Sequence, residues 1–262
     1  MMKSIYTPMS GALAQEKVLE IIANNLANMN TVGFKQDTVT FKLLEPEPNK
    51  NYSSPLPPAN FKVSFEDLAP LRGNEFAYVG VADVTKDMSQ GPVVQTGNET
   101  DFMLEGDGMF AFNGPEGLRY SRNGSMHLTA EGALVSGQGH PVLGERGAIF
   151  LKSGKFEMNP NGEIYQNGQY VDRLQIFSFQ NKQDLERVGD NYFFYGGPES
   201  ERTRMEHPGI SQGSLEGSNV SAMKSLAAMI MAHRSYEAYQ KTITNFDHMM
   251  DKSSNSVGEV HA

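Results

Sequence analysis

The chain has 262 residues, a formal net charge of −9 and no cysteine. The absence of cysteine excludes disulfides, thiolate zinc sites and cysteine nucleophiles, and the acidic balance argues against a nucleic-acid surface, which needs a concentrated basic patch. No apolar stretch approaches the roughly 20 residues that span a bilayer, and the N-terminus lacks the uninterrupted apolar segment of a signal peptide.

The first predicted element is an amphipathic helix that runs to about residue 30. Thr7 and Pro8 suit an N-cap and a first helical position, because the N–H that proline lacks is unbonded there in any case. The apolar residues recur mainly at steps of three and four, which makes a near-heptad stripe. The stripe comprises Met9, Ala12, Leu13, Leu19, Ile22, Ala23 and Leu26. Asn28, Asn30 and Gly33 supply its stop signals.

A proline-rich segment follows this helix. Five prolines fall within residues 45–58, a composition that favours an extended arm or linker over a packed core. Residues 35–88 are therefore predicted to form an extended arm and linker.

The middle of the chain has the pattern of short β-strands. Asn113-Gly114, Asn123-Gly124 and Asn167-Gly168 separate short apolar runs, and Asn-Gly is a strong signal for a tight hairpin turn. An antiparallel sheet or small barrel is therefore predicted for residues 89–215.

The last predicted element is a second, longer helix, which lacks proline and glycine from residue 218 to about residue 252. A helix of roughly 30 residues is about 45 Å long, too long for one face of a small domain. Its apolar stripe comprises Ala222, Leu226, Met229, Tyr236, Tyr239, Ile243, Phe246 and Met250. Residues 253–262 are polar and form a predicted tail.

The two apolar stripes predict the fold class and a mode of assembly. We expect an α+β protein whose terminal helices pair as a coiled-coil-like core, with a central antiparallel all-β domain. Both stripes are wider than a two-helix seam covers, so the remainder should meet neighbouring subunits in a ring or helical polymer. Alternatively, both helices pack on the β domain of their own chain.

Two catalytic patterns occur in contexts that do not support them. Residues 209–213 match the nucleophile elbow around Ser211, with Asp247 and His248 following in hydrolase order. However, the elbow requires a helix directly after it, whereas a Gly/Ser-rich stretch follows here. Residues 106–111 match a dinucleotide fingerprint, but a strand and not a helix follows. The six histidines show no paired spacing for a metal.

Motifs along much of the chain match one protein family. Residues 23–28 (Ala-Asn-Asn-Leu-Ala-Asn) and 31–35 (Thr-Val-Gly-Phe-Lys) closely resemble the N-terminal signature of flagellar basal-body rod and hook proteins. Residues 217–220, 229–230 and 236–237, with Arg234, are similar to the family's C-terminal helix. Further family motifs match at residues 90–91, 96–98, 106–110, 120–125, 131–132 and 139–142. The proline-rich arm is the part that the resemblance covers least.

The resemblance implies a structural subunit of the periplasm-spanning flagellar rod, and not an enzyme. It implies export by the flagellar type III apparatus without a cleavable signal peptide. The partners implied are copies of the chain and other rod and hook axial proteins, with no nucleic acid, membrane insertion or small-molecule substrate. No catalytic residue, cofactor or metal ligand is expected. In this family the terminal helices pair in the inner tube and the β domain faces outward.

Within the family, a few residues favour the proximal-rod branch. Residues 5–7, 171–174 and 215–220 resemble that branch, whereas the length and residues 96–98 also suit the distal rod. Tyr239 stands where distal-rod members usually carry asparagine, which favours the proximal branch.

The expected organisation has five segments: an assembly helix at 1–34, the arm at 35–88, the β domain at 89–215, an assembly helix at 216–252 and a tail at 253–262. The predicted assembly interface consists of Leu13, Leu19, Ile22, Asn24, Asn25, Leu26, Asn28, Gly33, Phe34, Leu226, Met229, Ile230, Arg234, Tyr236, Ile243 and Phe246. The alternative function is a secreted binding or hydrolytic β domain with accessory helices, and esterase turnover that depends on Ser211 would support it.

Overall fold

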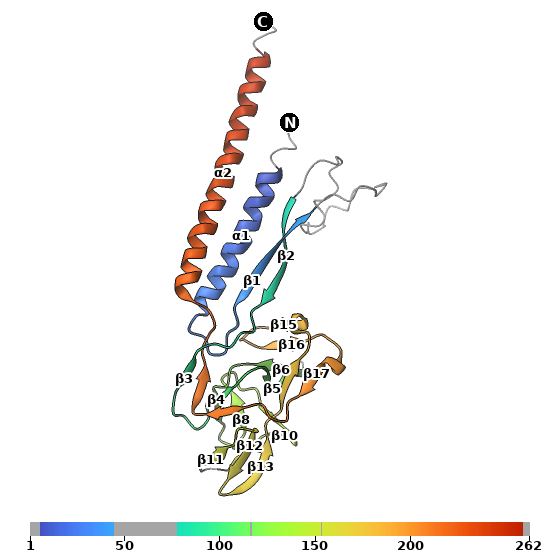
Figure 1. Cartoon of the computed structure of the whole chain (residues 1–262), viewed down its shortest axis with the longest axis vertical. Coiled ribbons are helices and arrows are strands. Elements are labelled where there is room, and N and C mark those ends of the chain that lie inside the picture. Colours follow the sequence, from blue (N-terminus) through green and yellow to red (C-terminus); the bar gives the residue numbers. More distant parts are fainter. Residues whose placement is uncertain (1–5, 45–77, 116, 153, 259–262) are drawn as a thin grey trace. The chain divides into compact units, whose positions relative to one another are not determined.

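The computed structural model describes residues 6–44, 78–115, 117–152 and 154–258 (Figure 1). The chain divides into two compact units. The helical unit combines residues 1–24, 38–85 and 223–262, and the β unit combines residues 25–37 and 86–222. The proline-rich segment 45–58 lies outside the described residues.

Two helices and a pair of strands make up the described part of the helical unit. Helix α1 spans Tyr6–Ala27, and helix α2 spans Ala222–Gly258 without proline or glycine before its last residue. Strand β1 (Asp37–Leu44) pairs with β2 (Tyr78–Lys86). Thr38 donates a hydrogen bond from its hydroxyl to the carbonyl of Thr85 at 3.1 Å, which joins these strands near their ends.

The β unit contains a six-stranded antiparallel sheet in the order β15-β16-β6-β5-β14-β17. Its strands are β5 (Met109–Gly114), β6 (Gly117–Ser121), β14 (Ile176–Phe179), β15 (Leu185–Arg187), β16 (Phe193–Tyr195) and β17 (Arg202–Arg204). A three-stranded sheet follows the chain order β11 (Phe156–Met158), β12 (Glu163–Gln166) and β13 (Gln169–Arg173).

The described part of this unit also contains two 3-10 helices (Lys182–Asp184 and Glu199–Glu201) and four further strand pairs, each of them antiparallel. They are β3 (Val93–Gln95) with β19 (Ser214–Glu216), β4 (Phe102–Leu104) with β18 (Ile210–Gln212), β7 (Met126–Leu128) with β8 (Leu134–Ser136), and β9 (Leu143–Gly144) with β10 (Gly147–Ala148). The α+β class is therefore confirmed.

Local turn chemistry explains the hairpin between β12 and β13. Asn167 and Gly168 join β12 to β13 with φ values of +52° and +76°. Positive φ at both central residues produces the backbone twist that matches paired strands, and asparagine and glycine tolerate it best. The Asn-Gly signal therefore predicted the turn correctly.

The core of the β unit consists of two clusters that are mainly aromatic and aliphatic. One cluster contains Phe102, Phe110, Phe112, Leu134, Ile164, Leu174 and Ile176, all at most 2% exposed. A second cluster contains Met109, Ala111, Tyr120, Phe179, Leu185 and Phe193 on the other face of β5. Alternate residues of β5 face the two clusters, as the two-residue period of a strand dictates.

Tyr192 should make the stability of the β unit fall at alkaline pH. Its buried hydroxyl donates to Ser136 Oγ at 2.6 Å, and burial raises its pKa. The folded state therefore keeps a proton that the unfolded chain releases above pH ~10, so stability is complete below that pH and declines as pH rises through the folded pKa. Urea unfolding between pH 8 and pH 11.5 measures this loss.

Two variants separate the phenol from its hydrogen bond. Tyr192→Phe should weaken the alkaline loss, because the titrating group is gone. Ser136→Ala keeps the buried phenol and removes one of its two acceptors, the other being Gln138 Oε1, so the loss should persist. An unchanged pH slope in Tyr192→Phe would contradict this account.

Candidate assembly site

Helix α2 has a half-buried to buried stripe along its whole described length. The stripe comprises Ser225, Met229, Ala232, Tyr236, Tyr239, Ile243, Phe246 and Met250. Successive members are three or four residues apart, the spacing that keeps one face of a helix against a partner. Small residues alternate with large ones in its first half, which allows another backbone to approach closely.

The two helices contact one another at Gly11 of α1. A Cβ atom at Gly11 would lie 2.6 Å from the ring of Tyr239, closer than side-chain atoms pack. The glycine therefore leaves room for the aromatic ring against the α1 backbone. Ala12 and Ala14 of α1 are also buried, at 8% and 4% exposure.

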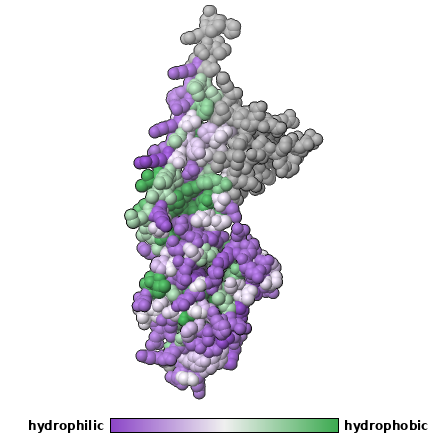
Figure 2. Space-filling model, viewed as in Figure 1, coloured by the Kyte–Doolittle hydropathy of each residue, from purple (hydrophilic) through white to green (hydrophobic). Residues whose placement is uncertain are grey.

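A second apolar stripe on α2 has no cover from the described residues. Met223, Leu226, Ile230 and Met231 are 84%, 48%, 56% and 68% exposed. Figure 2 shows hydrophobic side chains gathered over the first turns of α2, whereas its later turns are mainly hydrophilic. We call these four residues the α2 patch. Apolar groups that cluster in this way on a helix commonly mark an interaction surface.

Helix α1 carries a matching but smaller exposed stripe. Tyr6, Met9 and Leu13 are 40%, 46% and 39% exposed and follow one another at steps of three and four. We call these three residues the α1 patch. They lie on one side of the helix, because such steps return to the same face.

The structure separates the predicted interface residues into three groups. Leu13, Asn24, Leu226, Ile230 and Arg234 are exposed. Leu19, Ile22, Leu26, Asn28, Met229, Tyr236, Ile243 and Phe246 are half-buried. Asn25, Gly33 and Phe34 are buried in the β unit, so their packing is within the chain itself.

The third group belongs to a set of connecting segments that we call the neck: residues 25–37, 86–91 and 214–222. Asn25 makes reciprocal hydrogen bonds with Asp37, donating to its carbonyl at 2.8 Å and accepting from its N–H at 3.0 Å. The ring of Phe34 is 3% exposed and lies 4.5 Å below the guanidinium of Arg187. Arg187 also donates to Asp37 at 2.8 Å. These contacts fix the segment that follows α1 inside the β unit.

Gly33 shows why this segment carries glycine. Its φ is +67°, and its N–H donates to the carbonyl of Glu216 at 2.7 Å. A Cβ atom there would lie 2.5 Å from the backbone of Arg122 and Asn123. Both the left-handed conformation and the close approach of two backbones therefore favour glycine.

A buried cluster of three charged residues lies at the centre of the neck. Lys35, Arg122 and Glu216 are 0%, 4% and 1% exposed. Lys35 Nζ lies 2.6 Å from Glu216 Oε1, and Arg122 Nε lies 2.8 Å from Glu216 Oε2. Burial lowers the pKa of Lys35, while the hydrogen bond and charge of Glu216 oppose that effect. Sequence reasoning missed this cluster, because its members lie in three separate motifs that are far apart in the chain, and nothing in the sequence pairs them.

Asn219 joins the remaining neck segments through its side-chain amide. Its Oδ1 accepts from the N–H of Gln36 at 2.8 Å, and its Nδ2 donates to the carbonyls of Asp87 at 2.8 Å and Ser89 at 3.2 Å. One amide therefore links all three neck segments.

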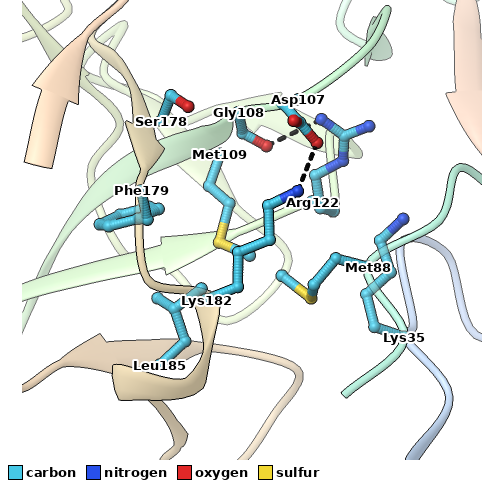
Figure 3. Close-up of a pocket in the computed structure, with 10 residues that line it drawn as sticks. All are labelled: Lys35, Met88, Asp107, Gly108, Met109, Arg122, Ser178, Phe179, Lys182 and Leu185. Atoms are coloured by element: carbon cyan, nitrogen blue, oxygen red, sulfur yellow. Dashed lines mark hydrogen bonds and ion pairs between the residues drawn. The ribbon is translucent and has the colours of Figure 1, made fainter. Parts of the chain in front are cut away.

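The cavity beside the buried cluster offers little room for a substrate. The cavity beside Lys35, Arg122 and Met109 has a volume of about 20 Å³ (Figure 3), which holds roughly one water molecule. In the close-up, Lys182 reaches across it to Asp107, and the two groups form an ion pair at 2.8 Å. Two hollows of about 550 and 600 Å³ are open to the surface.

The two catalytic patterns have structural roles. Ser211 lies in β18, opposite Met103 of β4, and β19 follows it instead of a helix. Gly106 and Gly108 have φ values of +78° and +132° and precede strand β5. Both glycines therefore belong to the connection between β4 and β5, and a strand follows them, as predicted.

The described residues contain neither a metal-ligand cluster nor a membrane-spanning helix. No group of three or more His, Asp or Glu side chains there is placed to hold a metal ion. Neither helix in this part of the chain is long and apolar enough to cross a membrane.

Three family models match the chain in succession. The flagella basal body rod protein model covers residues 5–35, the flagellar hook protein FlgE/F/G D1 domain covers 103–185, and the flagellar basal body rod FlgEFG protein C-terminal model covers 211–256. The flagellar basal-body rod protein FlgG of Borreliella burgdorferi is 30% identical over 97% of this chain and 98% of its own. The chain belongs to the flagellar basal-body rod protein family.

Both FlgF and FlgG rod proteins are among its relatives. The FlgF protein of Mesorhizobium japonicum is 29% identical over 90% of each chain, and that of Rhizobium meliloti is 28% identical over 98% of this chain and 99% of its own. The resemblance seen in the sequence is thus confirmed, and this rod protein is a structural subunit of the flagellum, not an enzyme.

Each of the three family models covers one member of the buried cluster. Lys35 lies in the N-terminal model, Arg122 in the D1 model and Glu216 in the C-terminal model. The cluster therefore joins the three recognisable parts of a rod protein through side chains.

Proposed function

We propose that this rod protein polymerises through its two helices with copies of itself and with other rod and hook axial proteins. The exposed α2 patch is the observation that carries the proposal. Burying one Leu, Ile or Met side chain contributes roughly 1.5–3 kcal/mol. Four such residues on adjacent turns therefore provide a driving force for association that the described part of the chain leaves unused.

The stripe from Ser225 to Met250 has a different role in this proposal. It pairs with α1 in the same chain as a coiled-coil-like core, and the contact between Gly11 and Tyr239 supports that pairing. Each subunit then presents the α1 patch and the α2 patch outward, and these bind the helices of neighbouring subunits. Because the two patches differ, one copy can join a second copy head to tail and extend a polymer.

The predicted interface divides accordingly. Leu13, Leu226, Ile230 and Arg234 would contact neighbouring subunits, since they are exposed. Leu19, Ile22, Leu26, Met229, Tyr236, Ile243 and Phe246 would form the helix pair and its edges. Asn24 and Asn28, at the end of α1, remain predicted interface residues.

We place the chain in the proximal rod. Tyr239 supports this choice, because its ring fills the space beside Gly11, and an asparagine there would leave that space partly empty. Identities of 29% to a FlgF protein and 30% to a FlgG protein do not separate the branches. We further propose that the flagellar type III apparatus exports the chain into the periplasm without a cleavable signal peptide, since Tyr6 and Met9 would be part of the assembled rod.

Ile230→Asp tests the assembly role of the α2 patch. Swimming in soft agar should be lost when this variant replaces the unmodified chain in a deletion strain, because a buried, unpaired carboxylate costs several kcal/mol. Electron microscopy of basal bodies should show rods that are incomplete. The purified variant should keep the secondary structure of the unmodified chain.

Gln240→Asp is the matched control, because it adds the same charge to an exposed polar position of the same helix. It should preserve swimming. Normal rods and normal swimming with Ile230→Asp would show that the α2 patch does not take part in assembly.

A further inference from the structure

The chain passes between its two units four times. At each crossing, the residue on the β-unit side belongs to the neck. The crossings fall between residues 24 and 25, 37 and 38, 85 and 86, and 222 and 223. Asn25 bonds to Asp37, which joins the first crossing to the second. Asp87 donates its N–H to the carbonyl of Gln36 at 2.8 Å, and Asn219 contacts both segments. The crossings are therefore tied to each other within the β unit.

The carboxylate of Glu216 has a directional partner for each oxygen. Oε1 accepts from Lys35 Nζ at 2.6 Å and from the N–H of Gly91 at 3.0 Å. Oε2 accepts from Arg122, whose Nη1 donates at 2.7 Å to the carbonyl of Gly108. Lys35 Nζ also donates to the carbonyl of Ser89 at 2.6 Å. A shift of any one segment by a residue would break several of these bonds together.

A buried cluster of charged residues contributes little net free energy to folding. Two cations and one carboxylate are removed from water, and the cost of desolvation offsets much of their attraction. Apolar residues of similar volume commonly replace buried ion pairs without loss of stability, but they lack directional contacts. The cluster therefore differs from an apolar core mainly in permitting a single arrangement of its neighbours.

We propose that Lys35, Arg122 and Glu216 set the register of the neck segments and contribute little to the stability of the β unit. In this role they are positioning residues. They hold the segment that leaves α1, the strand that leads to α2 and the loop after β6 in one relative position. The inference rests on the proposed rod function only where it predicts an effect on swimming.

The test uses the full chain with three substitutions together, Lys35→Met, Arg122→Met and Glu216→Gln. The glutamine keeps an acceptor for the N–H of Gly91, and the methionines keep most of the side-chain volume. We expect the urea midpoint of the β unit to stay close to that of the unmodified chain. Amide hydrogen exchange at Gly33 and Gly217 should become at least about tenfold faster, while exchange at Phe112 in the core should not change.

Swimming in a deletion strain is the second readout, and the triple variant should reduce it severely. Retained protection at Gly33 and Gly217 would overturn the proposal, because the register would then be fixed without the cluster. A large fall in the urea midpoint would also overturn it, because the cluster would then be a source of stability. Failure of the unmodified chain to restore swimming would count against the rod function and leave the exchange result intact.

Discussion

Glu216→Leu should lower the free energy of unfolding of the β unit by about 3–5 kcal/mol. The substitution removes the carboxylate that neutralises Lys35 and Arg122 and leaves both cations buried, at 0% and 4% exposure. It also removes the acceptor of the Gly91 N–H, and an unpaired buried donor adds to the cost. Urea unfolding at neutral pH, followed by tyrosine fluorescence, measures the change.

Glu157→Leu is the matched control, because Glu157 is an exposed glutamate in a strand of the same unit. Its effect should fall within about 0.5 kcal/mol. The contrast with the triple substitution of Lys35, Arg122 and Glu216 is the sharper comparison. Removing one charge should be far more damaging than removing all three, and equal losses in both variants would contradict the account of the cluster.

Gly11→Leu should separate α1 from α2 and abolish swimming. A Cβ atom alone would lie 2.6 Å from the Tyr239 ring, and leucine adds three further carbon atoms. Overpacking of this kind costs about 1–3 kcal/mol where the structure can adjust. Because the Tyr239 ring lies directly against the α1 backbone at Gly11, we expect the helices to move apart. Hydrogen exchange of the α1 amides measures the loss.

A second substitution checks that the cause is steric. Tyr239→Ala should restore protection in the Gly11→Leu background, because it removes the ring that the leucine meets; neighbouring residues commonly show such coupling. Ala23→Leu, at an exposed position of α1, is the control for the change in side-chain size. An additive loss in the double variant would show that Gly11 and Tyr239 do not share the contact.

Local patterns predicted the elements well. The steps of three and four in α2 identified Met229, Tyr236 and Ile243, and these residues are less exposed than Leu226 and Ile230. Asn167-Gly168 identified the β12–β13 hairpin, because a positive φ at two successive residues is a property of those residues alone. The other two Asn-Gly pairs are not such turns: residues 113–114 lie within β5, and residues 123–124 join β6 to β7, which are not paired. Both signals depend on contacts within a few residues of the chain.

In the first turns of α2, the sequence did not reveal which residues are covered. Leu226 was expected in the same stripe as Met229, but Ser225 and Ala232 are the residues buried at 6%, while Leu226 is 48% exposed. Apolar character alone predicts that the larger side chains are covered. A partner helix that packs closely covers the smaller ones instead. The phase of a helical stripe therefore requires knowledge of the partner.

The sequence did not predict the buried cluster of the neck for a different reason. Lys35 and Glu216 are separated by 181 positions in the chain, and a lone lysine or glutamate is more often solvated than buried. Their pairing arises from the tertiary fold and leaves no periodic signal. Phe34 and Gly33, predicted as interface residues, are buried beside them in the same unit.

The four crossings of the neck have a consequence for how such a chain can change in length. Gly33 and Glu216 share a hydrogen bond of 2.7 Å, so the chain enters and leaves the β unit at neighbouring points. Gln36 and Asp87 close residues 37–86 in the same way, at 2.8 Å. Segments with adjacent ends behave as modular insertions, which tolerate added or deleted hairpins. The chain between Gly33 and Glu216 is thus one insertion between the two helices, and residues 37–86 are a second insertion within the first. Each could be lengthened or exchanged while its point of attachment keeps the same geometry.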